Sequence, residues 1–384
     1  IRDRVFDQAK GSYLYDENGK EYIDFLAGAG TLNYGHNNPV LKEKLLEYIQ
    51  RDGIVHGLDM HTAAKREFMD AFYETILKPR DMDHVMQFTG PTGTNAVEAA
   101  LKIARNIKGR ENIISFTNGF HGVSLGALAA TGNSHHRGVA GVTMGGVTPM
   151  PYDGYLGDAF DTTEYLDKVL GDSSSGVDHP AAVIVETVQG EGGIRPVSAD
   201  TLLGFRQLCD EHNLLLLWDG VQCGHFRTGS FQSFQAILGD RLGDFLPDAV
   251  GMAKSLGGGF PMGAVWIAEK HADVLGPGTH GSTFGGNPLA CAVANKILEV
   301  IDRDGLAVLA RARLVVAVAV VAGEDQKSRC CEADVVGKCA GNKATAAGMK
   351  KDPDGWFNFD CGSGLSLIHI SEPTRPRLIS YAVF

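Results

Sequence analysis

The sequence is short of basic residues, and it has neither a long apolar run nor cysteines at the spacing of a zinc site. Lys and Arg number 35 against 46 Asp and Glu, and the resulting net charge of -11 argues against a nucleic-acid-binding surface. The apolar run at residues 314–322 has about half of the roughly 17 residues that a membrane span needs. The N-terminus shows no secretory signal. The seven cysteines fit a reducing compartment, so we expect a cytoplasmic protein.

The sequence does contain an alternation of short apolar runs with helical patterns. Hydrophobic residues make up 44% of the 384 positions, enough for a sizeable core. This alternation predicts an α/β fold with a mostly parallel sheet covered by helices on both faces. A hairpin at residues 13–22 and a helix at residues 39–51 are expected before it. We expect strands at residues 85–88, 112–116, 181–186, 214–219, 249–252 and 263–268.

The most informative residue is Lys254, which stands between an apolar run and the glycines at residues 257–259. A lysine in apolar surroundings is readily held as a neutral amine, and a neutral amine attacks carbonyl groups. A glycine cluster after a strand is by itself more often a simple turn. The functional interpretation of Lys254 therefore depends on the other residues of the same kind of site.

Asp219 and residues 90–94 supply two further groups. Asp219 ends an apolar run, which predicts a carboxylate at the edge of the sheet where α/β proteins bind ligands; capping of the next turn is the alternative. Residues 90–94 (Gly-Pro-Thr-Gly-Thr) precede a helical pattern, and the free N–H groups of a helix start bind phosphate. An ordinary threonine N-cap is the alternative there. Together, an amine for an aldehyde, a carboxylate for a ring nitrogen and an anion pocket point to pyridoxal 5'-phosphate.

The motifs that carry these residues resemble class III aminotransferases in sequence and in order. Members of that family are fold-type I pyridoxal phosphate enzymes and normally homodimers with shared active sites. The resemblance runs from about residue 10 to about residue 313 and implies a large mostly parallel sheet domain and a small α+β domain. Its motifs lie at residues 90–93, 120–122, 186–193, 219–222, 254–261 and 281–288.

The resemblance implies roles for individual residues. Lys254 would bond covalently to the cofactor and later move the substrate proton, and Asp219 would pair with the ring nitrogen. Glu191 would pair with an arginine that clamps the substrate carboxylate, as long as the site is empty. A metal is not expected, and His135-His136 is interpreted as a polar loop. The cofactor contacts implied are Thr92, Gly93 and Thr94 at the phosphate, Phe120 and His121 at the ring, Gln222 near the ring hydroxyl, and Thr283 at the phosphate of the partner subunit.

Two groups within the family resemble different parts of the chain. Residues 25–39, 51–60, 88–97 and 115–122 are similar to diaminobutyrate–2-oxoglutarate aminotransferases of ectoine synthesis. Residues 254–294 are similar to acetylornithine aminotransferases instead. Both imply transfer of a terminal amino group, with glutamate and 2-oxoglutarate as the other pair. We expect L-2,4-diaminobutyrate as the amino donor, because the first resemblance extends beyond the cofactor motifs.

Two positions depart from the family pattern near Asp219. Gly220 replaces a second acidic residue, and His225-Phe226 stand where small residues are usual. These changes leave Asp219 and Lys254 in place, so they affect substrate geometry more than cofactor binding.

The last part of the chain departs from the family altogether. After about residue 313 the pattern and its carboxylate-binding arginine are missing; Arg375 and Arg377 would be weak substitutes in a divergent tail. We interpret residues 314–364 as frame-shifted and residues 366–384 as adapter-derived, and the start at Ile1 as a truncated end. The expected division is residues 1–59 as the N-terminal part of the small domain, 60–301 as the large cofactor-binding domain, and 302–384 as a C-terminal segment that leaves the small domain incomplete or scrambled.

Three hypotheses for function remain from the sequence. The first is an active aminotransferase, and the second is a chain that binds pyridoxal phosphate but turns over poorly because its C-terminal part is damaged. The third is a nucleotide-binding α/β domain, which rests on residues 257–259 alone and lacks the glycine spacing and the acidic residue of such sites.

Overall fold

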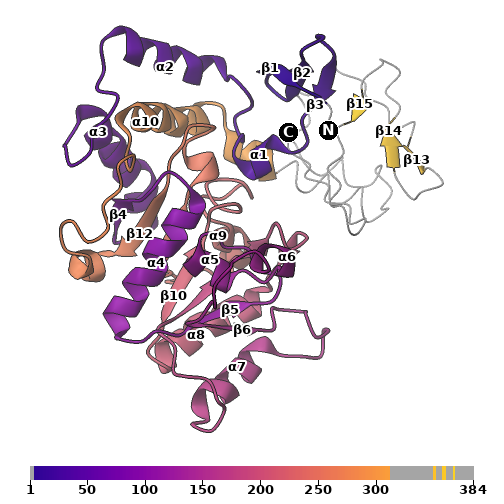
Figure 1. The fold of residues 1–384 in the computed structure, drawn as a ribbon, viewed down its shortest axis with the longest axis vertical. Coiled ribbons are helices and arrows are strands. Elements are labelled where there is room, and N and C mark those ends of the chain that lie inside the picture. Colours follow the sequence, from indigo (N-terminus) through magenta and orange to yellow (C-terminus); the bar gives the residue numbers. More distant parts are fainter. Residues whose placement is uncertain (1–3, 312–348, 352–356, 360–365, 368–384) are drawn as a thin grey trace.

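The computed structural model describes residues 4–311, 349–351, 357–359 and 366–367 (Figure 1). A seven-stranded sheet forms its centre, with strand order β4-β12-β11-β10-β7-β5-β6. β12 runs antiparallel to both of its neighbours, and the other pairings in the sheet are parallel. The strands are β4 (His84–Phe88), β5 (Ile113–Phe116), β6 (Val147–Met150), β7 (Ala182–Val185), β10 (Leu215–Asp219), β11 (Ala249–Met252) and β12 (Ala264–Ala268).

Alternate residues of β10 show why this sheet is buried on both faces. Leu216 and Trp218 pack into one apolar cluster, whereas Leu215 and Leu217 pack into another. A strand with apolar residues on both faces needs cover on both sides, which the helices between the strands provide. The predicted mostly parallel α/β fold is therefore confirmed, and all of its predicted strands form.

The helices connect the strands and cover the sheet. In Figure 1, α4 crosses in front of the sheet, while α2, α3 and α10 lie together at one end, where α10 contacts both of the others. The α-helices are α1 (Ala27–Gly30), α2 (Pro39–Gln50), α3 (Ala63–Phe72), α4 (Gly93–Lys108), α5 (Leu125–Ala130), α6 (Ser134–Arg137), α7 (Thr162–Gly171), α8 (Ala199–Glu211), α9 (Ser233–Leu238) and α10 (Pro288–Arg303). Short helices of other types are η1 (Tyr73–Leu77), η2 (Lys78–Arg80), η3 (Gly239–Arg241), η4 (Lys254–Leu256) and η5 (Glu269–Val274).

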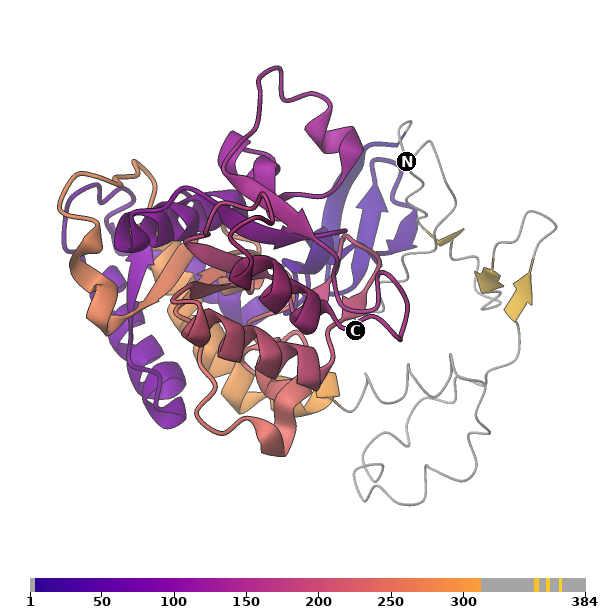
Figure 2. The same ribbon diagram turned by 90° about the horizontal axis from the view of Figure 1, so that it is seen from below.

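A second sheet lies beside the central one in both views (Figure 2). Its order is β1-β2-β3-β15, and the hairpin predicted at residues 13–22 is its β2–β3 pair. Two small antiparallel pairs, β8 with β9 and β13 with β14, complete the strands. Their bounds are β1 (Phe6–Lys10), β2 (Tyr13–Asp16), β3 (Glu21–Ile23), β8 (Val188–Gln189), β9 (Arg195–Pro196), β13 (Met349–Lys351), β14 (Phe357–Phe359) and β15 (Ser366–Leu367).

The structure corrects one local prediction and leaves others open. His135 and His136 lie in the short helix α6 rather than in a loop, because the Asn133 side chain accepts the His135 N–H at 2.9 Å and caps a helical turn. Arg375, Arg377 and most of the segment interpreted as frame-shifted or adapter-derived lie outside the described residues. Within the part of the chain that the structure describes, no helix is long and apolar enough to cross a membrane.

Candidate active site

Lys254 opens the turn η4, and Ala253 alone separates it from the end of β11. Its backbone φ of 35° lies in the left-handed region, which a non-glycine residue occupies only when its surroundings impose it. Burial lowers the pKa of the amine, although the negative charges of Asp219 and Glu186 act in the opposite direction. The fold thus holds Lys254 where a neutral amine is favoured more than in water, as attack on a carbonyl group requires.

Asp219 ends β10 and is buried at 4% exposure. Its Oδ2 lies 2.7 Å from Nδ1 of His121, and its Oδ1 accepts the N–H of Val221 at 3.1 Å. Burial acts to lower the pKa of His121, but the hydrogen bond and charge of Asp219 outweigh it, so this pKa is raised. His121 therefore fixes the orientation of the Asp219 carboxylate at the end of β10.

Glu186 is a residue to which the sequence assigned no role. It follows β7 and is buried at 4% exposure, and its Oε2 accepts the N–H of Phe120 at 2.9 Å. Burial raises its pKa to about 8. The signal that could have found it is the one that singled out Asp219: a carboxyl group at the end of a buried parallel strand.

The start of α4 is shaped for close approach to a ligand. Thr92 caps this helix, its Oγ1 accepting the Asn95 N–H at 3.4 Å. A Cβ added at Gly93 would lie 2.5 Å from Cγ1 of Val221, so only glycine fits there. The cap occupies the Asn95 N–H, so the N–H groups of Gly93 and Thr94 are those that remain in the first turn for an anion.

Thr94 belongs to a chain of hydroxyl groups that the sequence did not reveal. Its Oγ1 lies 2.7 Å from Oγ of Ser124, which donates to Oε1 of Glu98 at 2.7 Å. Oε1 of Glu98 also accepts two backbone N–H groups of α5. Gly122 makes room for the threonine, because a Cβ there would lie 2.3 Å from Thr94 Oγ1. The chain orients Thr94 beside the helix start.

Gln222 and the N-terminal segment close another side of the site. The Gln222 side chain donates to the Ala29 carbonyl at 3.1 Å, and a Cβ at Gly190 would collide with its Oε1 at 2.2 Å. Tyr34 donates to the carbonyl of Ser255, next to Lys254, at 3.1 Å. The segment that contains α1 is therefore tied to the cofactor motifs.

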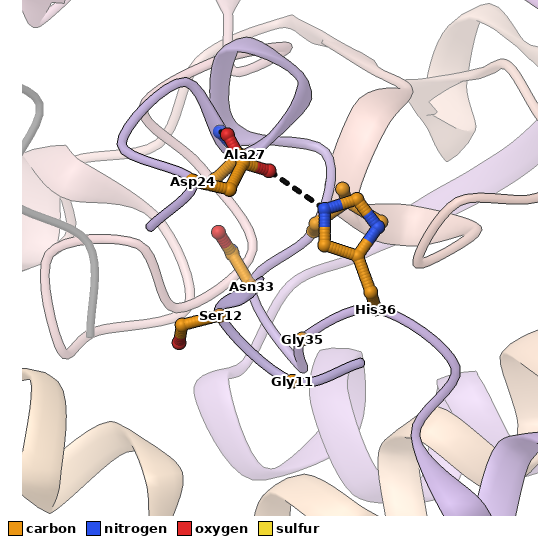
Figure 3. Close-up of a pocket in the computed structure, with 8 residues that line it drawn as sticks. Gly11, Ser12, Asp24, Ala27, Asn33, Gly35 and His36 are labelled. Atoms are coloured by element: carbon orange, nitrogen blue, oxygen red, sulfur yellow. Dashed lines mark hydrogen bonds and ion pairs between the residues drawn. The ribbon is translucent and has the colours of Figure 1, made fainter. Parts of the chain in front are cut away.

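A small pocket at the base of this segment shows what fixes it (Figure 3). Asp24 points its carboxylate at His36, with Oδ2 2.6 Å from Nε2, while its Oδ1 accepts two backbone N–H groups at the start of α1. Asn33, which also lines the pocket, accepts from Arg227 at 2.5 Å. These bonds connect the first strands of the chain to the loop after Gln222.

The remaining predicted residues are Glu191, Phe120 and Thr283. Glu191 is half-buried in the turn between β8 and β9, and its charge acts on Lys254. Phe120 is half-buried, with its ring centroid 5.5 Å from that of His136. Thr283 is exposed and stands next to Phe284, a phenylalanine that is 57% exposed.

His225 and Phe226, the departures noted in the sequence, lie in the loop after Gln222. Both have positive φ angles, 51° and 68°, in the region that glycine occupies without strain. His225 is 1% exposed, and neither of its ring nitrogens has a hydrogen-bond partner among the described residues. Burial lowers its pKa to about 3, so the ring is neutral at physiological pH.

The groups that the sequence singled out thus converge at the carboxyl edge of the sheet. A buried anion, a lysine with a lowered pKa and a helix start where Gly93 admits no side chain match the ring nitrogen, aldehyde and phosphate of pyridoxal 5'-phosphate. The glycines at residues 257–259 are explained by the turn itself, since a Cβ at Gly257 would lie 2.1 Å from the Phe260 carbonyl oxygen. Fold and site together define an α/β protein that binds a phosphorylated, amine-reactive ligand.

The family model "Aminotransferase class-III" matches residues 2–321. The chain therefore belongs to the class III aminotransferase family.

Similar proteins have related names. A diaminobutyrate–2-oxoglutarate transaminase of Bordetella parapertussis is 55% identical over 296 residues, which are 77% of this chain and 66% of the relative. The enzyme of the same name from Streptomyces coelicolor is 51% identical over 304 residues, or 79% of this chain and 70% of its own. The chain spans just under two thirds of the Bordetella relative.

Solved structures share the fold. The ornithine aminotransferase of Toxoplasma gondii is 30% identical, with a TM-score of 0.66 over 79% of this chain and 68% of that one. An (S)-enantioselective omega-transaminase from Thermomicrobium roseum is 27% identical, with a TM-score of 0.69 over 79% of this chain and 70% of that one.

Proposed function

We propose that the chain is a pyridoxal phosphate-dependent aminotransferase that moves the terminal amino group of L-2,4-diaminobutyrate to 2-oxoglutarate. The observation that carries the proposal is the placement of Lys254 and of the Asp219–His121 pair at one edge of the sheet. The relatives named diaminobutyrate–2-oxoglutarate transaminases, at 55% and 51% identity, support the choice of substrates.

Each site residue has a task that follows from its surroundings. Pyridoxal phosphate, when bound, supplies an aldehyde that bonds to amines and a ring that accepts electrons. Nζ of Lys254, with its lowered pKa, accepts the proton that leaves the substrate Cα and releases it again later in the reaction. Asp219 holds the positive charge of the ring nitrogen, and His121 fixes the orientation of Asp219.

The phosphate and ring contacts complete the cofactor site in this proposal. Thr92, Gly93 and Thr94 bind the phosphate at the start of α4, Phe120 covers the ring, and Gln222 lies near the ring hydroxyl. Glu191 faces the substrate, where an ionised carboxylate without an arginine partner would repel a second anion.

The active unit in this proposal is a homodimer, with Thr283 contributing to the partner subunit's phosphate site. Exposed apolar side chains near this threonine support it. Phe284 is 57% exposed, and its ring centroid lies 5.7 Å from that of His56. Ile54, Val55 and Met60, in the same segment as His56, are 50%, 60% and 49% exposed. Apolar residues gathered on a surface are typical of an interface.

The proposal also covers the location of the protein and the division of the chain. A cytoplasmic location is supported by Cys209, Cys223 and Cys291, which are free and buried. We keep residues 60–301 as the cofactor-binding domain, residues 1–59 as the N-terminal part of the small domain, and residues 302–384 as a C-terminal segment that is frame-shifted at 314–364 and adapter-derived at 366–384.

An acetylornithine or ornithine donor is the alternative substrate, favoured by the likeness to the Toxoplasma ornithine aminotransferase. Poor turnover is the alternative outcome, because the family pattern is not found in the sequence after about residue 313.

A single-turnover experiment separates these possibilities. The protein is loaded with pyridoxal phosphate, and its visible absorbance is followed after adding diaminobutyrate, acetylornithine or ornithine. If diaminobutyrate changes the cofactor absorbance fastest, the proposal is supported. If another donor changes it fastest, that donor is the substrate instead of diaminobutyrate. Cofactor binding without conversion by any donor indicates impaired turnover, and lack of binding refutes the proposed function.

A further inference from the structure

Glu98, on α4, carries a half-buried carboxyl group to which the proposed function gives no task. Its Oε1 accepts three hydrogen bonds, from the Ser124 hydroxyl at 2.7 Å and from the backbone N–H groups of Gly126 and Ala127 at 2.9 and 3.0 Å. A Cβ at Gly126 would lie 2.3 Å from Oε2 of Glu98, so this turn of α5 has room for the carboxyl group because the residue is glycine. Glu98 therefore caps α5 in place of Ser124, whose own side chain makes no cap bond.

These contacts decide where the hydroxyl protons point. An oxygen that accepts two N–H groups is itself an acceptor, so the Ser124 hydroxyl donates its single proton to Oε1 of Glu98. Oγ of Ser124 can then only accept from the Thr94 hydroxyl, whose oxygen lies 2.7 Å away. The Ser124 N–H in turn donates to Oγ1 of Thr94 at 3.4 Å. The proton of the Thr94 hydroxyl therefore points to Ser124.

The other threonine at the start of α4 is engaged in a similar way. Oγ1 of Thr92 donates to Oδ1 of Asn95 at 2.7 Å and accepts the Asn95 N–H at 3.4 Å. Each threonine hydroxyl thus gives its proton to a neighbouring side chain. The donors that remain for an anion at this helix start are the backbone N–H groups of Gly93 and Thr94.

We propose that Glu98 is a positioning residue of the phosphate site, which acts through Ser124 to turn the Thr94 hydroxyl away from the phosphate. The helix start then holds the phosphate by the backbone N–H groups of Gly93 and Thr94. The Thr94 hydroxyl fixes the position of its own N–H and does not bond to the ligand. The inference rests on the proposed function, because it needs a phosphate at the start of α4.

The same carboxyl group ties the phosphate end of the site to the ring end. Residues 120–122 precede α5, and the hydroxyl of Thr131, at the C-cap of this helix, accepts the His121 N–H at 3.0 Å. Glu98 holds the opposite end of α5. Loss of its three hydrogen bonds should therefore disturb both ends of the cofactor site. A side chain that keeps an oxygen in the same place should preserve them.

A double-mutant cycle tests the direction of the Thr94 hydroxyl. The probe is 4'-deoxypyridoxine 5'-phosphate, which has the ring and the phosphate but no aldehyde, so calorimetry measures its binding without turnover. Thr94→Val and Ser124→Ala remove the two ends of one hydrogen bond, and each should weaken binding about 5–30-fold. We expect the double variant to bind as Ser124→Ala does, because both substitutions remove the same bond.

The cycle separates the inference from the proposed function. If the double variant is weakened by the product of the two single factors, the Thr94 hydroxyl bonds to the phosphate itself and the inference is overturned. If the wild type does not bind the probe at all, the proposed function is refuted as well.

Substitutions of Glu98 test its role as the anchor. Glu98→Gln keeps an acceptor oxygen and should bind the probe within about 3-fold of the wild type, whereas Glu98→Ala should weaken binding about 10-fold or more. Asn106→Ala is the matched control on α4, since the exposed Asn106 side chain donates to the Lys102 carbonyl of the same helix. Equal losses in Glu98→Gln and Glu98→Ala would overturn the inference. If Glu98→Ala does not fold, the cycle at Thr94 and Ser124 decides.

Discussion

Replacing His225 by Met should make the protein less sensitive to acid. In the folded state the pKa of His225 is lowered to about 3, whereas an unfolded histidine has a pKa near 6.5. Between these values the unfolded chain binds a proton that the folded chain cannot take up. Stability from this group is therefore fully present above pH 6.5 and is lost as the pH falls towards 3.

The magnitude follows from the two pKa values. Protonation of His225 in the unfolded chain lowers the unfolding free energy of the wild type by about 2 kcal/mol between pH 7 and pH 5. Over the whole range between the two pKa values the loss is about 5 kcal/mol. Methionine has no proton to bind and adapts to an irregular space. The variant should therefore gain about 2 kcal/mol relative to the wild type when the pH drops from 7 to 5.

Urea denaturation of both proteins at the two pH values measures this difference. Every other titrating group, including Glu186, is common to both proteins and cancels in the comparison. His61→Met is the control, because His61 is exposed. If the difference in unfolding free energy between His225→Met and the wild type is the same at pH 7 and pH 5, the argument is refuted.

Three further predictions concern the cofactor site. Gly93→Ala places a Cβ 2.5 Å from Val221 and should weaken cofactor binding by about 10-fold or more, measured by fluorescence titration. Gly145→Ala is the control and should leave cofactor binding unchanged, because a Cβ there meets nothing within 4 Å. Equal effects of the two substitutions would argue against a tight helix start. Ser124→Ala removes the bridge to Glu98 and should cost about 1–2 kcal/mol of phosphate affinity, measured with inorganic phosphate as competitor; unaltered competition would contradict the hydroxyl chain. Thr283→Ala should weaken cofactor binding in the dimer, and mixing it with Lys254→Ala should restore one complete site per hybrid. Activity of the mixture no higher than the average of the two parents would contradict a site shared between subunits.

The sequence was sufficient to predict the sheet because its strands are continuously apolar. Residues 214–219 and 249–252 have no polar interruption, and both form strands where expected. β6 (Val147–Met150) was missed, since it contains a proline and lies at the edge of the sheet, where the apolar pattern is weaker. Helix α6 was missed because a single turn depends on one cap rather than on periodicity.

The site was predictable only where a residue marks the end of a strand. Asp219 and Lys254 were found in this way, and their roles stay predictions. The contact between Asp219 and His121 joins residues 98 positions apart, and the Thr94–Ser124 contact joins residues 30 apart. Such pairings follow from tertiary packing, which spacing in one sequence does not encode.

The position of the covalent bond to the cofactor tests the central claim most directly. The protein is incubated with pyridoxal phosphate, treated with sodium borohydride to make any lysine–aldehyde bond permanent, and digested for mass spectrometry. The account predicts the cofactor mass on the peptide that contains Lys254, and its loss in Lys254→Ala. A label on another lysine, or a label that survives in the variant, would contradict it.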